Sequence, residues 1–322
     1  MSPINFTPEN FSEGDMYKTI IVPLDGSLFA EQAVATAATI AQHAGADLVL
    51  TRVHESYLYE GLENSSYEDM SRRDEEEYLA SIADHVEVTY GLTAKRTLLT
   101  GAIAPAISDF AAGMEAPLIV LSTHGRTGFS RFWLGSIADA LARHARAPVL
   151  MLRHRRAEVG LEAPPHRFEN ILVPLDGSDL ADNVLPHVAT FGQIFGARLT
   201  LLRVVAPAPA PAALYAVPIA LPPQQQLDDT LTDRVDAAQG WVDALATRLR
   251  GDDIPLDVRT DVRVSEAAAP AILDAAVSHA ADTIAIATHG RGMSRLVVAS
   301  VADKILRGGP EAVLVVRPAP TS

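Results

Sequence analysis

Residues 20–27 read Ile-Ile-Val-Pro-Leu-Asp-Gly-Ser, and residues 171–178 read Ile-Leu-Val-Pro-Leu-Asp-Gly-Ser. Three further blocks recur in the same order. They are Ala-Pro-Ala-Ile at 104–107 and 269–272, Thr-His-Gly-Arg at 123–126 and 288–291, and Val-Leu-Met-Leu-Arg at 149–153 against Val-Leu-Val-Val-Arg at 313–317. A repeat of this length indicates two copies of one domain rather than a solenoid of short units.

The boundary between the copies is a charged stretch that contains Pro164 and Pro165. This composition is typical of a linker. We therefore expect a first domain at 17–153, a linker at 154–168 and a second domain at 169–318.

Within each copy, short β-branched runs alternate with Ala-rich stretches. The first copy predicts strands at 18–22, 47–53, 94–99, 118–122 and 149–152, and helices at 27–44, 67–90, 103–113 and 131–146. The second copy predicts strands at 170–173, 198–204, 256–262, 283–287 and 312–316. Nearly continuous apolar strands that alternate with helices predict an α/β fold, with a doubly wound, five-stranded parallel sheet in each of two tandem domains.

Composition excludes several classes of partner. The 322 residues carry a net charge of -14, which disfavours binding to nucleic acid or to anionic membranes. The sequence has no cysteine, so disulfides and thiolate metal sites are excluded. No uncharged apolar run reaches the length of a membrane helix, and residues 1–17 lack the pattern of a signal peptide. We expect a cytoplasmic protein.

In a doubly wound sheet, ligands bind beyond the carboxyl ends of the strands, where the strand order reverses. The loop after the first strand contains Pro23, Leu24 and Asp25, and Ser27 is placed to cap the next helix. The Asp25 carboxylate could accept a hydrogen bond from a ribose hydroxyl or a base amino group. The alternative is that Asp25 is only a turn or capping residue.

The loop after the fourth strand is the second candidate. The strand ends at Leu121 and Ser122, and the glycines beyond it would allow backbone N–H groups to approach an anion at a helix start. Ser136 adds a hydroxyl donor. Gly135 and Ser136 fall inside the helix expected at 131–146, so a helix start at these residues is left open. The alternative is a glycine-rich loop that only turns into a helix.

These motifs resemble a tandem universal stress protein over residues 17–318. ATP-binding members of that family show Gly, two residues, Gly, nine residues, then Gly and Ser or Thr. In the first copy Ser122 replaces the first glycine, whereas Gly125 and the pair Gly135-Ser136 match. The resemblance implies a Rossmann-like fold of the adenine nucleotide alpha hydrolase-like type.

The resemblance also implies a ligand and its contacts. Gly125, Gly135 and Ser136 would hold the phosphates, Asp25 would meet the adenosine, and Val53 would pack on the adenine or bond it through its backbone. The implied ligand is ATP, with Mg²⁺ as a further candidate and ADP or AMP as alternatives. The expected binding residues are Pro23, Leu24, Asp25, Val53, Leu121, Ser122, His124, Gly125, Arg126, Gly128, Gly135, Ser136 and Ile137.

The second copy departs from the pattern. Ala287 replaces the first glycine, and Ser300-Val301 stands where Gly-Ser is expected. We expect this copy to bind nucleotide weakly or not at all and to act structurally. Its Pro/Ala-rich insert at 206–223 would cover the pocket or bind a partner.

Three functions remain open. The first is a stress-response or signalling protein in which ATP occupancy modulates a conformation or the binding of an unknown protein partner. The second is an enzyme that hydrolyses ATP slowly or transfers an adenylyl group. His124 and Arg126 are the only candidates near the phosphates, so we expect at most slow hydrolysis. The third is a scaffold that binds no nucleotide.

Two further features carry structural predictions. The resemblance implies that the two domains pair edge to edge through their last strands as an internal pseudo-dimer, a role that the apolar strands at 149–152 and 313–316 suit, and a homodimer is a further option. The acidic stretch at 68–77 is typical of a solvated helix face rather than of a site.

Overall fold

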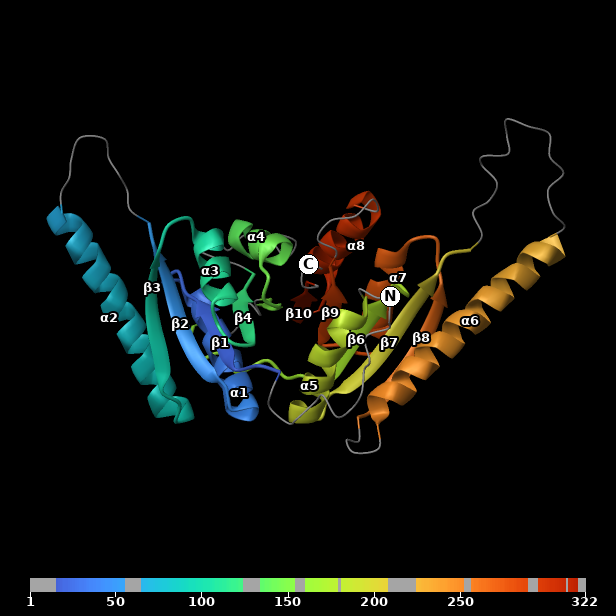
Figure 1. Ribbon diagram of the computed structural model, residues 1–322, viewed down its shortest axis with the longest axis horizontal. Helices are drawn as coiled ribbons and strands as arrows, with labels where there is room; N and C mark the ends of the chain where they lie inside the picture. Colours follow the sequence, from blue (N-terminus) through green and yellow to red (C-terminus); the bar gives the residue numbers. More distant parts are fainter. Residues whose placement is uncertain are drawn as a thin grey trace.

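The computed structural model describes residues 16–55, 65–123, 134–153, 160–178, 181–207, 224–251, 256–288, 295–310 and 312–317 (Figure 1). The first half comprises β1 (Thr19–Pro23), α1 (Leu28–Ala44), β2 (Asp47–His54), α2 (Ser65–Tyr90), β3 (Ala94–Thr100), α3 (Ile103–Ala112), β4 (Pro117–Ser122), α4 (Ser136–His144) and β5 (Val149–Leu152). The second half comprises β6 (Asn170–Leu175), the 3-10 turn η2 (Ala181–Val184), α5 (Leu185–Phe195), β7 (Arg198–Val205), α6 (Gln224–Arg250), β8 (Val258–Val264), α7 (Ala268–Ser278), β9 (Thr283–Ala287), α8 (Arg295–Gly308) and β10 (Ala312–Val316).

The strands form one continuous ten-stranded sheet in the order β3-β2-β1-β4-β5-β10-β9-β6-β7-β8. All pairs within each half are parallel. The two halves repeat the same order in opposite directions, so they are related by an approximate twofold axis. The predicted α/β class with two doubly wound parallel sheets is confirmed.

The two halves meet through their last strands, as the sequence predicts. β5 and β10 pair antiparallel over four residue pairs, with Leu150 opposite Leu314 near the middle. Every residue of both strands is buried. A strand that is apolar on both faces needs a covered edge, and each half provides that cover for the other.

Helices cover both faces of the sheet (Figure 1). One apolar cluster packs α1, α2, α5 and α6 against one face, and a second cluster packs α3, α4, α7 and α8 against the other. Each cluster contains residues from both halves. The hydrophobic core is therefore shared across the β5–β10 junction. No helix in the described ranges is both long enough and apolar enough to cross a lipid bilayer.

The described part of the connection between the halves is held against α1. The Gly160 N–H donates to the Leu28 carbonyl at 2.9 Å, and the His166 N–H donates to Thr36 Oγ1 at 2.8 Å. His166 Nε2 also lies 3.0 Å from Thr283 Oγ1 on β9. This segment, which has the composition of a linker, therefore fastens the first half to the second.

The structure corrects two expected boundaries. The helix expected at 131–146 begins at Ser136 and ends at His144, because Gly135 has the extended backbone of a capping residue (φ -60, ψ 147). The strand expected at 256–262 instead runs from Val258 to Val264, because its pairing with β7 starts at Leu199 and Val258.

Candidate functional site

A cleft with a volume of about 590 Å³ opens at the carboxyl ends of β1, β2 and β4. It lies where β1 is flanked by β2 on one side and β4 on the other, which is the reversal point of the strand order. The expected site residues that line it are Pro23, Leu24, Asp25, Val53, Leu121, Ser122, Gly135, Ser136 and Ile137. The expected residues His124, Gly125, Arg126 and Gly128 lie outside the described residues.

Asp25 forms a turn, as the alternative interpretation of this residue as a turn or capping residue predicts. Its Oδ1 accepts hydrogen bonds from the Ser27 N–H at 2.9 Å and from Ser27 Oγ at 2.6 Å. Ser27 Oγ in turn accepts from the Ala30 N–H, so the predicted helix cap is confirmed. Asp25 nevertheless lines the cleft, so the turn and a ligand contact are compatible.

Gly26 follows Asp25 with a φ of +81°, a conformation that L side chains rarely adopt. A Cβ atom here would lie 2.8 Å from Arg52 Nη1. The glycine therefore lets the Arg52 guanidinium lie against the loop, inside the cleft.

The start of α4 forms the opposite wall of the cleft. Gly135 donates its own N–H to the Thr123 carbonyl at 2.9 Å, and no side chain caps the helix. The first-turn N–H groups of Ser136, Ile137 and Ala138 have no partner within the helix. An anion at this point would meet these amides, the helix dipole and the Ser136 hydroxyl.

Gly135 and Ser122, which both line the cleft, also make contacts that the sequence did not predict. The Gly135 N–H is taken up by the Thr123 carbonyl, and a Cβ atom at this residue would lie 3.0 Å from that carbonyl oxygen. Ser122, at the position of the replaced glycine, accepts a hydrogen bond from Gln32 Nε2 at 2.9 Å. Both contacts fix the end of β4 against its neighbours.

The structure adds a polar cluster that the sequence analysis missed. Glu75 on α2 pairs with Arg52 Nε at 3.2 Å and with His54 Nδ1 at 2.8 Å. The Arg52 guanidinium lies 5.4 Å from the centre of the Tyr78 ring. Glu75 belongs to the acidic stretch interpreted as a solvated face, and for this residue that interpretation is wrong. Its neighbours 72–74, 76 and 77 are exposed as expected.

Tyr78 connects the cluster to α1. Burial raises the pKa of the Tyr78 hydroxyl, and the nearby Glu31 carboxylate raises it further. The hydroxyl therefore stays protonated at neutral pH and donates to Glu31 Oε1 at 3.1 Å. Together these contacts hold α1, α2 and β2 in a fixed arrangement on one side of the cleft.

The second half has a smaller and more apolar counterpart. Its pocket has a volume of about 230 Å³ and is lined mainly by aliphatic side chains. Arg203 occupies the place of Arg52, 5.9 Å from the Trp241 ring centre. By the spacing from that ring, Ala238 stands where the first half has Glu75.

The helix that follows β9 also differs from its counterpart. α8 begins at Arg295, so Ser300 and Val301 lie within the helix. Val301 and Ile305 line the second pocket as Ile137 and Leu141 line the first, so in the structure Ser300 is the counterpart of Ser136, one position away from the match that the sequence pattern predicts. Ser136, in contrast, is the first residue of α4. N–H groups inside a helix are bonded to the carbonyls four residues earlier. The amides at this point of the second half are therefore not available to an anion.

In the described ranges, no group of three His, Asp or Glu side chains is placed to hold a metal ion.

The family comparison matches both halves. The model of the universal stress protein family matches this sequence twice, over residues 16–153 and 167–317. The chain belongs to the universal stress protein family. Curated relatives include a universal stress protein of Methanocaldococcus jannaschii, 30% identical over 148 residues that make up 45% of this chain and 86% of the relative. Another, from Thermus aquaticus, is 33% identical over 141 residues, or 43% of this chain and 100% of the relative.

Solved universal stress proteins share the tandem fold. A universal stress protein from Archaeoglobus fulgidus covers 96% of this chain and 100% of its own, with a TM-score of 0.64 and 17% sequence identity. A putative universal stress protein from Pseudomonas aeruginosa covers 95% of each chain, with a TM-score of 0.60 and 16% identity. At these identities the likeness concerns the fold alone.

Proposed function

We propose that the first half of this universal stress protein binds an adenine nucleotide, ATP, in the cleft between the Asp25 loop and the start of α4. The observation that carries the proposal is that Asp25 and the Gly135-Ser136 turn line the same cleft of about 590 Å³. That volume falls in the usual range of pockets for small ligands.

The polar groups are distributed as a nucleotide requires. Phosphates would meet the first-turn amides of α4 and Ser136, and Asp25 would accept a hydrogen bond from the ribose. Adenine would lie against Val53, near the Arg52–Glu75 pair that lines the same cleft. The family offers a precedent for this ligand class, since one universal stress protein was solved in complex with cAMP.

Occupancy of this cleft would act as a signal in a stress response. A ligand shifts a conformational equilibrium only if it binds the two states with different affinity. The cleft is formed by a strand end, a loop and a helix start, so closure around a nucleotide would favour one placement of these elements. A protein partner would detect that placement.

Calorimetric titration with ATP tests the proposal. The substitution S136A removes a hydroxyl donor to a charged phosphate, and such bonds contribute about 1.5–3 kcal/mol, so ATP should bind at least about tenfold more weakly. The matched control is S300A at the equivalent position of the second half, which should leave the affinity unchanged. Absence of ATP binding to the unaltered chain, or equal effects of both substitutions, would exclude this function for the cleft.

A further inference from the structure

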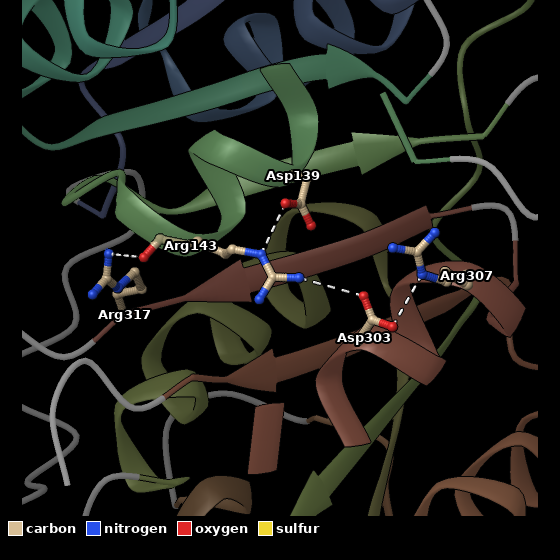
Figure 2. Close-up of polar contacts among 5 residues, drawn as sticks. All are labelled: Asp139, Arg143, Asp303, Arg307 and Arg317. Atoms are coloured by element: carbon tan, nitrogen blue, oxygen red, sulfur yellow. Dashed lines mark hydrogen bonds and ion pairs between the residues drawn. The ribbon is translucent and has the colours of Figure 1, made fainter. Parts of the chain in front are cut away.

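Helix α4 contributes both to the cleft and to the contact with the second half. Its first residue, Ser136, lines the cleft, and its apolar side places Ala138, Leu141 and Ala142 in the core. Its polar side faces α8 of the second half (Figure 2). Through α4, a contact made by the second half can act on the first-turn amides.

Four charged side chains join the two helices in a chain (Figure 2). Arg143 Nε lies 2.9 Å from Asp139 Oδ2 one turn earlier on α4, and Arg143 Nη2 lies 3.4 Å from Asp303 Oδ1 on α8. Asp303 Oδ2 then lies 3.0 Å from Arg307 Nε. Asp139 and Arg143 of the first half are matched by Asp303 and Arg307 of the second, so this row of ion pairs follows the approximate twofold axis that relates the halves.

A second contact holds the last turn of α4. Arg317, just beyond β10, donates from Nη1 to the Arg143 carbonyl oxygen. Arg153, at the equivalent place after β5, donates to the Leu306 carbonyl oxygen on α8. A cation at a helix C-terminus satisfies a carbonyl that has no helical partner and complements the helix dipole. Each half thus caps the helix of the other.

We propose that the second half positions the phosphate-binding turn of the first. Asp303 and Arg317 hold the side and the end of α4, and this nine-residue helix carries the amides that would meet the phosphates. Asp303 and Arg317 are positioning residues, and they set the affinity of the first cleft for a phosphorylated ligand. The inference rests on the proposed nucleotide binding. It also gives the second half, which departs from the nucleotide-binding pattern, a role in that binding.

Electrostatics at a distance predicts the opposite effect for one substitution. D303N removes a negative charge, so a purely long-range field would make the anionic ATP bind slightly more tightly. Loss of positioning would instead make it bind more weakly. The control D274N makes the same charge change on the neighbouring helix α7, at an exposed residue. The double variant D303N/R317M leaves the net charge unaltered and breaks both contacts with α4.

The experiment measures dissociation constants of the full chain for ATP and for adenosine at constant ionic strength. Since exposed ion pairs contribute modestly, ATP should bind about threefold more weakly to D303N and about tenfold more weakly to D303N/R317M. D303E, which keeps a carboxylate, should restore most of the affinity, and D274N should not weaken it. Adenosine lacks phosphates, so its affinity should stay unchanged in all variants.

Two results would overturn the inference while leaving nucleotide binding intact. One is ATP binding to D303N/R317M that is as tight as to the unaltered chain. The other is an equal loss for ATP and adenosine, which would indicate general damage rather than displacement of the phosphate-binding turn. An unaltered chain that binds neither ligand would overturn the proposed function and this inference together.

Discussion

Asp25 illustrates how one side chain shapes a loop and also faces a cleft. Its Oδ1 holds the turn through Ser27, and the carboxylate remains part of the cleft wall. Asp176 makes the same turn through Ser178 in the second half, where the pocket is smaller. The aspartate alone therefore does not distinguish a binding loop from a structural one, and the difference lies in the opposite wall.

His187 provides a residue-scale prediction about stability. Its Nδ1 lies 2.7 Å from the Tyr17 hydroxyl, which joins α5 to the first half. Burial lowers the pKa of His187 to about 4 from 6.5, so the folded protein favours the neutral imidazole. The unfolded chain binds a proton below about pH 6.5, so the free energy of unfolding should fall as the pH decreases from 6.5 towards 4.

The expected contribution of His187 is about 2 kcal/mol between these pH values, less than the full shift implies because the residue is only partly buried. Urea unfolding at pH 7 and pH 4.5 measures it, with H187Q as the comparison, since acidic residues also titrate here. The unaltered chain should lose more stability than H187Q. Equal losses in the two chains would show that His187 does not titrate as described.

Only part of the candidate site was visible in the sequence. The Asp25 loop and the Gly135-Ser136 turn recur or follow a known spacing, so pattern alone finds them. Arg52 and Glu75 have no such spacing, because one lies on β2 and the other on α2. They meet only when the helix packs across the strand, and a charged residue on a polar helix face carries no sign of that contact.

At the scale of elements, the start of α4 determines what the cleft can bind. A side chain at Gly135 would press on the Thr123 carbonyl, with a Cβ atom at 3.0 Å. G135A should therefore displace α4, lower the free energy of unfolding by about 1–2 kcal/mol and weaken ATP binding.

The matched control is G113A at the end of α3, where a Cβ atom would lie 3.5 Å from its nearest neighbour, an ordinary contact. It should change stability by less than about 0.5 kcal/mol. Denaturant unfolding of both variants measures the difference. If G135A proved as stable as G113A, and bound ATP as tightly as the unaltered chain, the close approach at Gly135 would not matter.

The sequence predicted most strands and helices because their apolar runs are long and uninterrupted. It left the start of α4 open, because Gly135 and Ser136 follow residues that suit a helix. In the second half, Ser300 lies inside α8, although the sequence pattern placed it where the first half has the Gly-Ser pair that begins a helix. The extended backbone of Gly135 is open to any residue, and what requires a glycine there is the Thr123 carbonyl oxygen, 3.0 Å from the place of a Cβ atom.

At the scale of the whole molecule, the two halves share one core. Leu314 of β10 is 2% exposed and pairs with Leu150 of β5, and the cluster that contains both extends over both halves. L314A should lower the free energy of unfolding by about 2–5 kcal/mol. Because the core is continuous, circular dichroism and tryptophan fluorescence should report one coincident transition. Two separate transitions, with only one shifted by L314A, would contradict a shared core.

The pairing of the halves was predictable because the family resemblance implies it and their last strands are apolar on both faces. The contacts that Arg317 and Asp303 make with α4 were not, because they join residues more than 150 positions apart. No local pattern encodes such contacts. They appear only once the two sheets join as one.

Native mass spectrometry of the freshly purified full chain tests the central claim most directly. The account predicts one adenine nucleotide per chain after addition of ATP, and a much lower occupancy in S136A than in S300A. Two nucleotides per chain would show that the second half binds as well as the first. No bound nucleotide at any ATP concentration would contradict the assignment of the cleft.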